Sequence, residues 1–269
     1  MPTDHLTIAV LHPLLSQPLG DEGNALVLAS RAEARGITTD LRTVHDAVRI
    51  DGPAVLLLGG AADARQPELA RRLAADPGFR DAVGAGAAVF AVDAGFGVLA
   101  HSFVDITGAP TDGLGLIDGI VHSDDPADGP VVTQATTEPS LPPGSGYESH
   151  RGRITLGNAA RPLWRLELGI GNDGATDGAV QDNVFATWMH GPVLARNPEL
   201  ADTLLERALG RPMAPLPDPR LDGLARSLRE QHLREDRSDP TGWGGRIYGT
   251  SPMRAWLRRT MRAVRGRGH

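Results

Sequence analysis

Asp93 is the residue of this chain whose surroundings are most typical of chemistry. An apolar run over 87–92 stops at it, and the small residues Ala94 and Gly95 follow before a second apolar segment begins. This pattern predicts a strand, a sharp turn (the elbow) and a helix, and a side chain at such a turn projects into a pocket above the sheet edge. Backbone N–H groups behind the turn can stabilise an oxyanion. Asp93 can therefore act as a nucleophile or base, or it can simply cap the helix that begins at Ala94.

The residue types that the chain lacks restrict this chemistry. Its 269 residues include no cysteine and no lysine, all 27 strongly basic residues being arginine. A thiolate nucleophile, a disulfide framework and a cysteine-ligated zinc are therefore excluded, as are a P-loop lysine and a lysine Schiff base. Glu148 and His150 resemble a metal-binding pair, but no third ligand stands at a suitable spacing, so we interpret them as structural. We expect neither a metal nor a cofactor.

The elements that must position Asp93 alternate between strands and helices. Strands are predicted at 6–11, 37–44, 54–58 and 87–92, and helices at about 24–34 and 66–83. This order is typical of an α/β fold with a doubly wound, mostly parallel sheet flanked by helices, which binds ligands at the carboxyl ends of its strands. Gly59 and Gly60 lie at such an end, where the missing side chains let a ligand or another backbone segment approach closely.

After residue 101 the pattern changes to short β-like segments separated by Gly, Pro and Asp. They are predicted at 113–120, 130–137, 146–156 and 163–170, and they favour mainly antiparallel strands. A further run over 183–189 ends at His190, which is either a packed core histidine or a partner of Asp93. We favour the contact with Asp93, because an ionised carboxylate would stabilise a charged imidazole. A helix is predicted over 198–209.

Residues 211–269 are expected to form a helical C-terminal extension to a domain of residues 1–210. A linker is indicated by Pro212, Pro215, Pro217 and Pro219, and helices follow at about 221–234 and 252–264. Six arginines crowd the positions 254–267 without an acid among them, whereas 81–150 contain no arginine. The basic helix is most simply a solvated face, although an acidic partner or anionic lipid would also suit it.

Composition favours a globular protein of the cytoplasm. The hydrophobic fraction is 41% and the formal net charge is −6. No apolar run is long enough to cross a bilayer, and the first residues lack the pattern of a signal peptide. We expect no nucleic-acid partner, and membrane contact only if the basic C-terminal helix provides it.

Several motifs make the chain resemble a known family. They lie at 20–24, 57–60, the elbow, 147–153, 169–174, 183–192 and 197–202. In this order they resemble a class I glutamine amidotransferase domain of the cobyric acid synthase type, closest to the glutaminase subunit of lipid II isoglutaminyl synthase. The resemblance covers about residues 5–210.

The resemblance implies roles for the residues of the elbow. In that family a cysteine at the elbow attacks the side-chain amide of glutamine, and the histidine of a His-Gly-Pro motif is its base. His190 would be this base, and Asp93 stands where the cysteine should be. The residues expected to line the oxyanion hole and pocket are Gly59, Gly60, Ala94 and Gly95.

The resemblance also implies the loss of a carboxylate clamp. The family places an arginine shortly after a Gly-Leu-Gly-Leu segment to hold the α-carboxylate of glutamine. This chain has that segment at 113–116, but its next arginine is Arg151. Two features specific to glutamine hydrolysis, the thiol and the clamp, are therefore expected to be absent.

Two main hypotheses of function follow. The first is a degenerate glutamine amidotransferase-like subunit, a pseudoenzyme that organises a Mur-ligase-like, ATP-dependent partner in amide or amidation chemistry of the cell wall or of a natural product. The second is a repurposed hydrolase or transferase that uses Asp93 with His190 on a small molecule bound at the elbow. An amidotransferase with unusual chemistry ranks third, because the amine is a far worse leaving group than the attacking aspartate.

Overall fold

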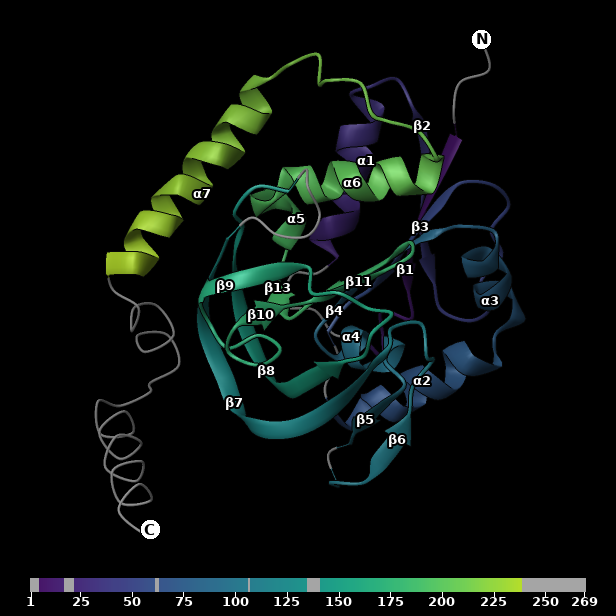
Figure 1. Ribbon diagram of the computed structural model, residues 1–269. Coiled ribbons are helices and arrows are strands. Elements are labelled where there is room, and N and C mark those ends of the chain that lie inside the picture. Colours follow the sequence, from purple (N-terminus) through teal and green to yellow (C-terminus); the bar gives the residue numbers. More distant parts are fainter. Residues whose placement is uncertain (1–4, 17–21, 61–62, 106, 135–140, 239–269) are drawn as a thin grey trace.

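Two β-sheets organise the chain (Figure 1). The computed structural model describes residues 5–16, 22–60, 63–105, 107–134 and 141–238. The first sheet is formed mainly by the N-terminal part of the chain, and all strands of the second except its last lie in sequence between two neighbouring strands of the first. This insertion places the second sheet beside the elbow.

The first sheet has six strands in the order β11-β12-β4-β3-β1-β2. Its members are β1 (His5–Leu11), β2 (Thr38–Val44), β3 (Ala54–Leu58), β4 (Ala88–Val92), β11 (Ala179–Gln181) and β12 (Val184–Thr187). All neighbouring pairs are parallel except β11 with β12. Every residue of β3 and β4 is buried, as expected for parallel strands covered on both faces. The expected doubly wound, mostly parallel sheet is confirmed.

Helices cover both faces of this sheet. One face packs on α1 (Gly23–Glu33), α5 (Val193–Arg196) and α6 (Pro198–Leu209), and the other on α2 (Gln66–Ala75), α3 (Pro77–Gly84) and α4 (Ala94–Leu99). The single helix expected over 66–83 is wrong. The chain breaks at Asp76, whose carboxylate accepts the N–H of Gly78 at 2.9 Å, because Pro77 has no N–H and can only begin a new helix.

The second sheet is mainly antiparallel, as expected. It contains β5 (Ser102–Val104), β6 (Pro110–Asp112), β7 (Gly119–Gln134), β8 (Ser145–Leu156), β9 (Trp164–Leu168), β10 (Thr176–Asp177) and β13 (Met189–His190). The long hairpin of β7 and β8 forms most of it. The strand expected over 113–120 is wrong for its first part, because the N–H groups of Gly113, Leu114 and Leu116 bond back to the segment 99–101 and to Val98.

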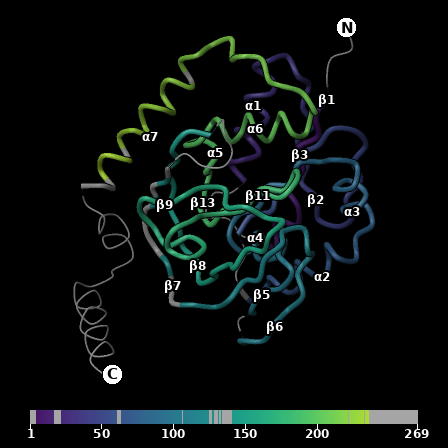
Figure 2. The backbone as a smooth tube through the Cα atoms, viewed as in Figure 1, coloured from purple at the N-terminus to yellow at the C-terminus, as the bar shows by residue number. Residues whose placement is uncertain are grey.

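The last described helix is α7 (Arg220–Ser238), which contacts α5, β7 and β8 (Figure 2). Arg31 of α1 donates to Asp202 of α6 and to Asp222 of α7, each at 2.7 Å, and Arg229 of α7 donates to Glu199 at 2.8 Å. Ion pairs therefore join α7 to the preceding residues. The helix expected over 252–264 lies outside the described residues. No helix in the described part of the chain is long and apolar enough to cross a membrane.

Candidate functional site

The backbone at Asp93 has the geometry of a strained elbow. Asp93 follows β4 directly and has φ 49° and ψ −114°, a region that non-glycine residues rarely occupy. Its side chain makes no capping hydrogen bond to α4, so the capping alternative is wrong. The carboxylate instead borders a cavity above the sheet, where its side chain is 18% exposed.

Adjacent parallel strands bring His190 to Asp93. β12 pairs with β4, and the N–H of Asp93 donates to the carbonyl of Thr187 at 3.0 Å. Nε2 of His190 then lies 3.9 Å from Oδ2 of Asp93 and 3.2 Å from the carbonyl oxygen of Ser149. The imidazole, with only 4% of its side chain exposed, is thus within ion-pair distance of the carboxylate but outside direct hydrogen-bond distance.

The glycines named for the oxyanion hole meet at the same place. A Cβ added to Gly95 would lie 2.9 Å from the carbonyl oxygens of Leu58 and Gly59, so the start of α4 packs directly on the end of β3. Only glycine allows this approach. Ala94 borders the cavity at Asp93, and Gly59 borders a neighbouring one of about 380 Å³. Their role in holding an oxyanion, with that of Gly60, remains a prediction.

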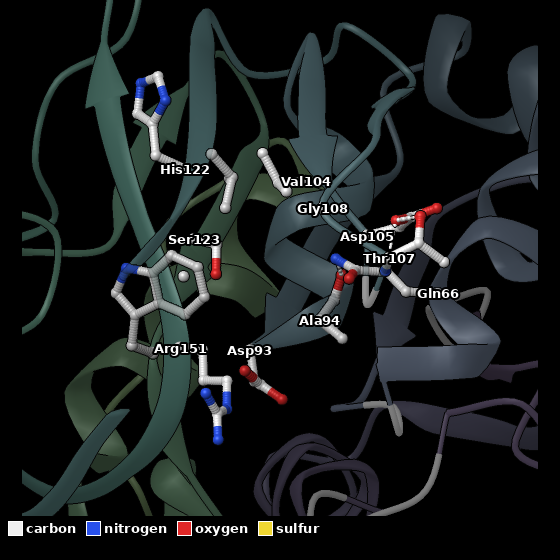
Figure 3. A pocket seen from close by; sticks show the side chains of 13 residues that line it. Gln66, Asp93, Ala94, Val104, Asp105, Thr107, Gly108, His122, Ser123 and Arg151 are labelled. Carbon is white, nitrogen blue, oxygen red and sulfur yellow. Dashed lines mark hydrogen bonds between the residues drawn. The ribbon is translucent and has the colours of Figure 1, made fainter. Parts of the chain in front are cut away.

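The cavity at the elbow has a volume of about 500 Å³. It is bordered by strands of the second sheet, by the elbow and by the N-terminal end of α2, and its polar and charged side chains are Gln66, Asp93, Asp105, Thr107, His122, Ser123 and Arg151 (Figure 3). Val104, Val121 and Trp188 supply an apolar wall. A volume of this size suits a small-molecule ligand.

Arg151 corrects an expectation drawn from the sequence. The absence of arginine between 81 and 150 implied that no guanidinium would be available for a carboxylate at the elbow. β8 instead carries Arg151 into the cavity, where it and Asp93 extend into the same region (Figure 3). Sequence reasoning also missed Gln66 and Trp188, because nothing local in the sequence reports that these segments border the elbow.

A buried polar network supports the wall formed by Trp188. The indole stacks on His150 with ring centroids 4.4 Å apart, and its Nε1 donates to Asn172 at 2.9 Å. Nε2 of His150 lies 3.1 Å from Glu148, which also accepts the N–H groups of residues 170 and 171 at 2.7 and 2.8 Å. These contacts support a structural interpretation of Glu148 and His150. Within the described ranges, no group of three or more His, Cys, Asp or Glu could hold a metal ion.

Asp177 is the other notable group of this network. Burial, reinforced by the charge of Glu148, raises the pKa of Asp177 to about 7 from 3.8. Thr187 donates to one of its oxygens at 2.5 Å, and the N–H of Trp188 donates to the other at 3.2 Å. The carboxyl group of Asp177, whose pKa is near neutral pH, is therefore hydrogen-bonded to the backbone of Trp188, which forms part of the apolar wall of the cavity.

Comparisons with known proteins show which family the chain resembles. Residues 12–198 match the CobB/CobQ-like glutamine amidotransferase domain family. The GatD subunit of lipid II isoglutaminyl synthase (glutamine-hydrolyzing) from Streptococcus pneumoniae is 30% identical over 213 residues, which cover 76% of this chain and 80% of that protein. The corresponding subunit from Staphylococcus aureus is 26% identical over 224 residues, covering 79% and 88%. A solved glutamine amidotransferase structure aligns with 18% identity and a TM-score of 0.47, covering 75% of this chain and 98% of that one.

Proposed function

The chain belongs to the CobB/CobQ-like glutamine amidotransferase family, and from this premise we propose that it is a subunit that no longer hydrolyses glutamine. It acts instead with an ATP-dependent, Mur-ligase-like partner in amide or amidation chemistry. Asp93 occupies the position of the family's nucleophilic cysteine. The similarity to GatD, which is named as a subunit of a synthase, supports action within a hetero-complex.

The observation that carries the proposal is a retained elbow without a thiol. Asp93 keeps a positive φ of 49°, a strain worth about 1–3 kcal/mol that persists only where the surroundings impose it. The chain contains no cysteine that could supply a thiolate from elsewhere. A carboxylate that attacks an amide must expel an amine, which is the poorer leaving group, so the adduct returns to the starting amide.

The framework around the elbow supports a binding role. Oδ1 of Asn24 accepts the N–H of Leu194 at 3.0 Å, and Gly23 packs so closely on Pro192 that a Cβ would lie 2.9 Å from that ring. Asn197 donates to the carbonyl of Ser145 at 3.0 Å. Motif residues on both sides of His190 thus keep their packing roles, as expected if the fold is maintained for binding.

An assay of ammonia release tests the proposal. The purified full-length chain is incubated with glutamine, beside an Asp93→Ala variant as control. We expect no turnover above that control. Glutamine turnover that Asp93→Ala abolishes would contradict the proposal.

The partner is tested separately. Affinity purification of the tagged protein from its native host, followed by mass spectrometry, is expected to recover a Mur-ligase-like ATP-dependent ligase in stoichiometric amount. Recovery of the chain alone, under conditions that preserve weak complexes, would count against a hetero-complex.

One observation favours a second candidate. The 3.9 Å separation between Asp93 and His190 suits a hydrolase in which Asp93 attacks the carbonyl of an activated aryl ester and expels the phenolate, a far better leaving group than an amine. His190 would then take a proton from the water that cleaves the resulting anhydride. Hydrolysis of p-nitrophenyl acetate that is lost in both Asp93→Asn and His190→Gln would favour this candidate.

A further inference from the structure

Arg151 is a charged group that the proposed function leaves unused. It lies on β8 next to Gly152, whose partner in the β7 ladder is Ser123, and both of these residues border the cavity. Over the described ranges of the chain, the guanidinium makes no hydrogen bond or ion pair. Arg153 on the same strand differs, because it donates to the carbonyl of Gly152 at 2.9 Å and lies 3.7 Å from Asp124.

The cavity presents this cation together with a carboxylate. Asp93 lines the same space, with its Oδ2 3.9 Å from His190 (Figure 3). Asp105 also borders the cavity, but its Oδ1 already accepts three local hydrogen bonds, two from Thr107 and one from Ala109. Arg151 and Asp93 therefore bring a guanidinium and a carboxylate to the same cavity.

The wall of the cavity adds an apolar surface. Trp188, Val104 and Val121 border it, and Trp188 is fixed by its stacking on His150. A ligand that satisfies these groups together needs a carboxylate, a cation and a short aliphatic chain that joins them. The volume of about 500 Å³ accommodates such a molecule.

On the basis of the proposed function, we infer that the cavity binds a small basic amino acid. The carboxylate of this ligand pairs with Arg151, and its side-chain cation pairs with Asp93. A guanidinium matches a carboxylate with two parallel hydrogen bonds, and Asp93 supplies the charge that a cationic side chain requires. Glutamate is disfavoured because its second carboxylate would face Asp93. Arg151 and Asp93 thus determine ligand specificity together, the first through the carboxylate of the ligand and the second through its cation.

Calorimetric titration of the full-length chain tests this inference with three probes, namely L-arginine, agmatine, which lacks the carboxylate, and L-glutamate. We expect the wild type to bind L-arginine at least about tenfold more tightly than either of the others. Arg151→Gln should weaken the binding of L-arginine by about tenfold or more, and it should leave the affinity for agmatine unchanged within about twofold. Asp93→Asn should weaken the binding of L-arginine and the binding of agmatine to a similar extent.

Arg165→Gln is the matched control, because Arg165 is an exposed arginine on β9 outside the cavity. This variant should bind L-arginine as the wild type does. The inference would be overturned if Arg151→Gln bound L-arginine as tightly as the wild type does. It would also be overturned if the wild type bound L-glutamate as tightly as L-arginine, or did not bind L-arginine. Because binding and turnover are measured separately, glutamine hydrolysis by the wild type counts against the proposed function alone, and failure of L-arginine binding counts against this inference alone.

Discussion

The position and the reactivity of the side chain at residue 93 have different sources. The elbow supplies position, since it aims the side chain of residue 93 into the cavity whatever that side chain is. The side chain supplies reactivity, and a carboxylate cannot replace a thiolate in amide cleavage. The cavity therefore combines the backbone geometry of an elbow with a carboxylate at its turn.

Asp93→Cys tests this separation. We expect the variant to fold and to release ammonia from glutamine at a low but measurable rate, because the thiol returns to the elbow and Arg151 remains available for the α-carboxylate. Adding Arg151→Gln should raise KM more than it lowers kcat, since the guanidinium binds ground state and transition state alike. Complete inactivity of Asp93→Cys would show that Arg151 does not replace the family's clamp.

Asp177 gives a prediction about pH. Its pKa in the folded protein is raised to about 7, so between about pH 4 and 7 the folded state binds more protons than the unfolded state. Its contribution to stability is complete below the unfolded value of 3.8 and is lost as pH rises through 7, by at most about 1.4 kcal/mol per pH unit.

Asp177→Asn should therefore flatten the dependence of the unfolding free energy on pH between 5 and 7, as measured by urea titration. Asp182→Asn is the control, because this exposed carboxyl group lies on the turn between β11 and β12 and outside the buried network. An identical pH slope in the wild type and in Asp177→Asn would contradict the prediction.

At the level of the elements, the break between α2 and α3 depends on one side chain. Asp76 is 7% exposed, and its carboxylate accepts the N–H groups of Gly78 at 2.9 Å and of Val48 at 2.8 Å. It thus caps α3 and holds the segment that follows β2. Because Pro77 prevents α2 and α3 from forming one continuous helix, hydrogen bonds within a helix cannot replace those that the Asp76 carboxylate accepts.

Asp76→Ala should lower the unfolding free energy by about 1–3 kcal/mol, because one helix cap is lost and a buried N–H is left unsatisfied. Chemical denaturation measures this directly. Asp81→Ala, at an exposed position within α3, should change stability by less than about 0.5 kcal/mol. Equal effects of the two substitutions would show that the capping contacts do not stabilise the fold.

For the whole molecule, we propose that residues 1–210 fold as one domain and that 211–269 are an extension. The two sheets and α1–α6 are complete at α6, which ends at Leu209. Within the described ranges, α7 is joined to this body by the ion pairs of Arg31 with Asp222 and of Arg229 with Glu199.

A chain truncated after Gly210 should therefore melt cooperatively, with a midpoint lower by several degrees because those ion pairs and the cover of α5 are lost. Differential scanning calorimetry of the full-length and truncated proteins compares them. A truncated product that is insoluble or lacks a cooperative transition would mean that α7 belongs to the core.

The sequence by itself determined the strands β1 to β4 of the first sheet and the elbow. A parallel strand that is covered on both faces must be apolar along its length, so β3 and β4 were visible as runs bounded by Gly59 and Asp93. The break at Pro77 was also encoded locally, although the apolar pattern of the two helices obscured it.

Only the tertiary structure decided that Arg151 borders the same cavity as Asp93, whereas the approach of His190 to Asp93 was expected from the sequence. His190 lies near Asp93 because β12, which pairs with β4, leads directly into β13, and Arg151 borders the same cavity because β7 and β8 form a hairpin beside the elbow. Pairing between distant strands depends on the packing of the entire chain, and local sequence patterns carry no record of that register. The elbow at Asp93 was therefore readable from the sequence, whereas the presence of Arg151 in the same cavity was not.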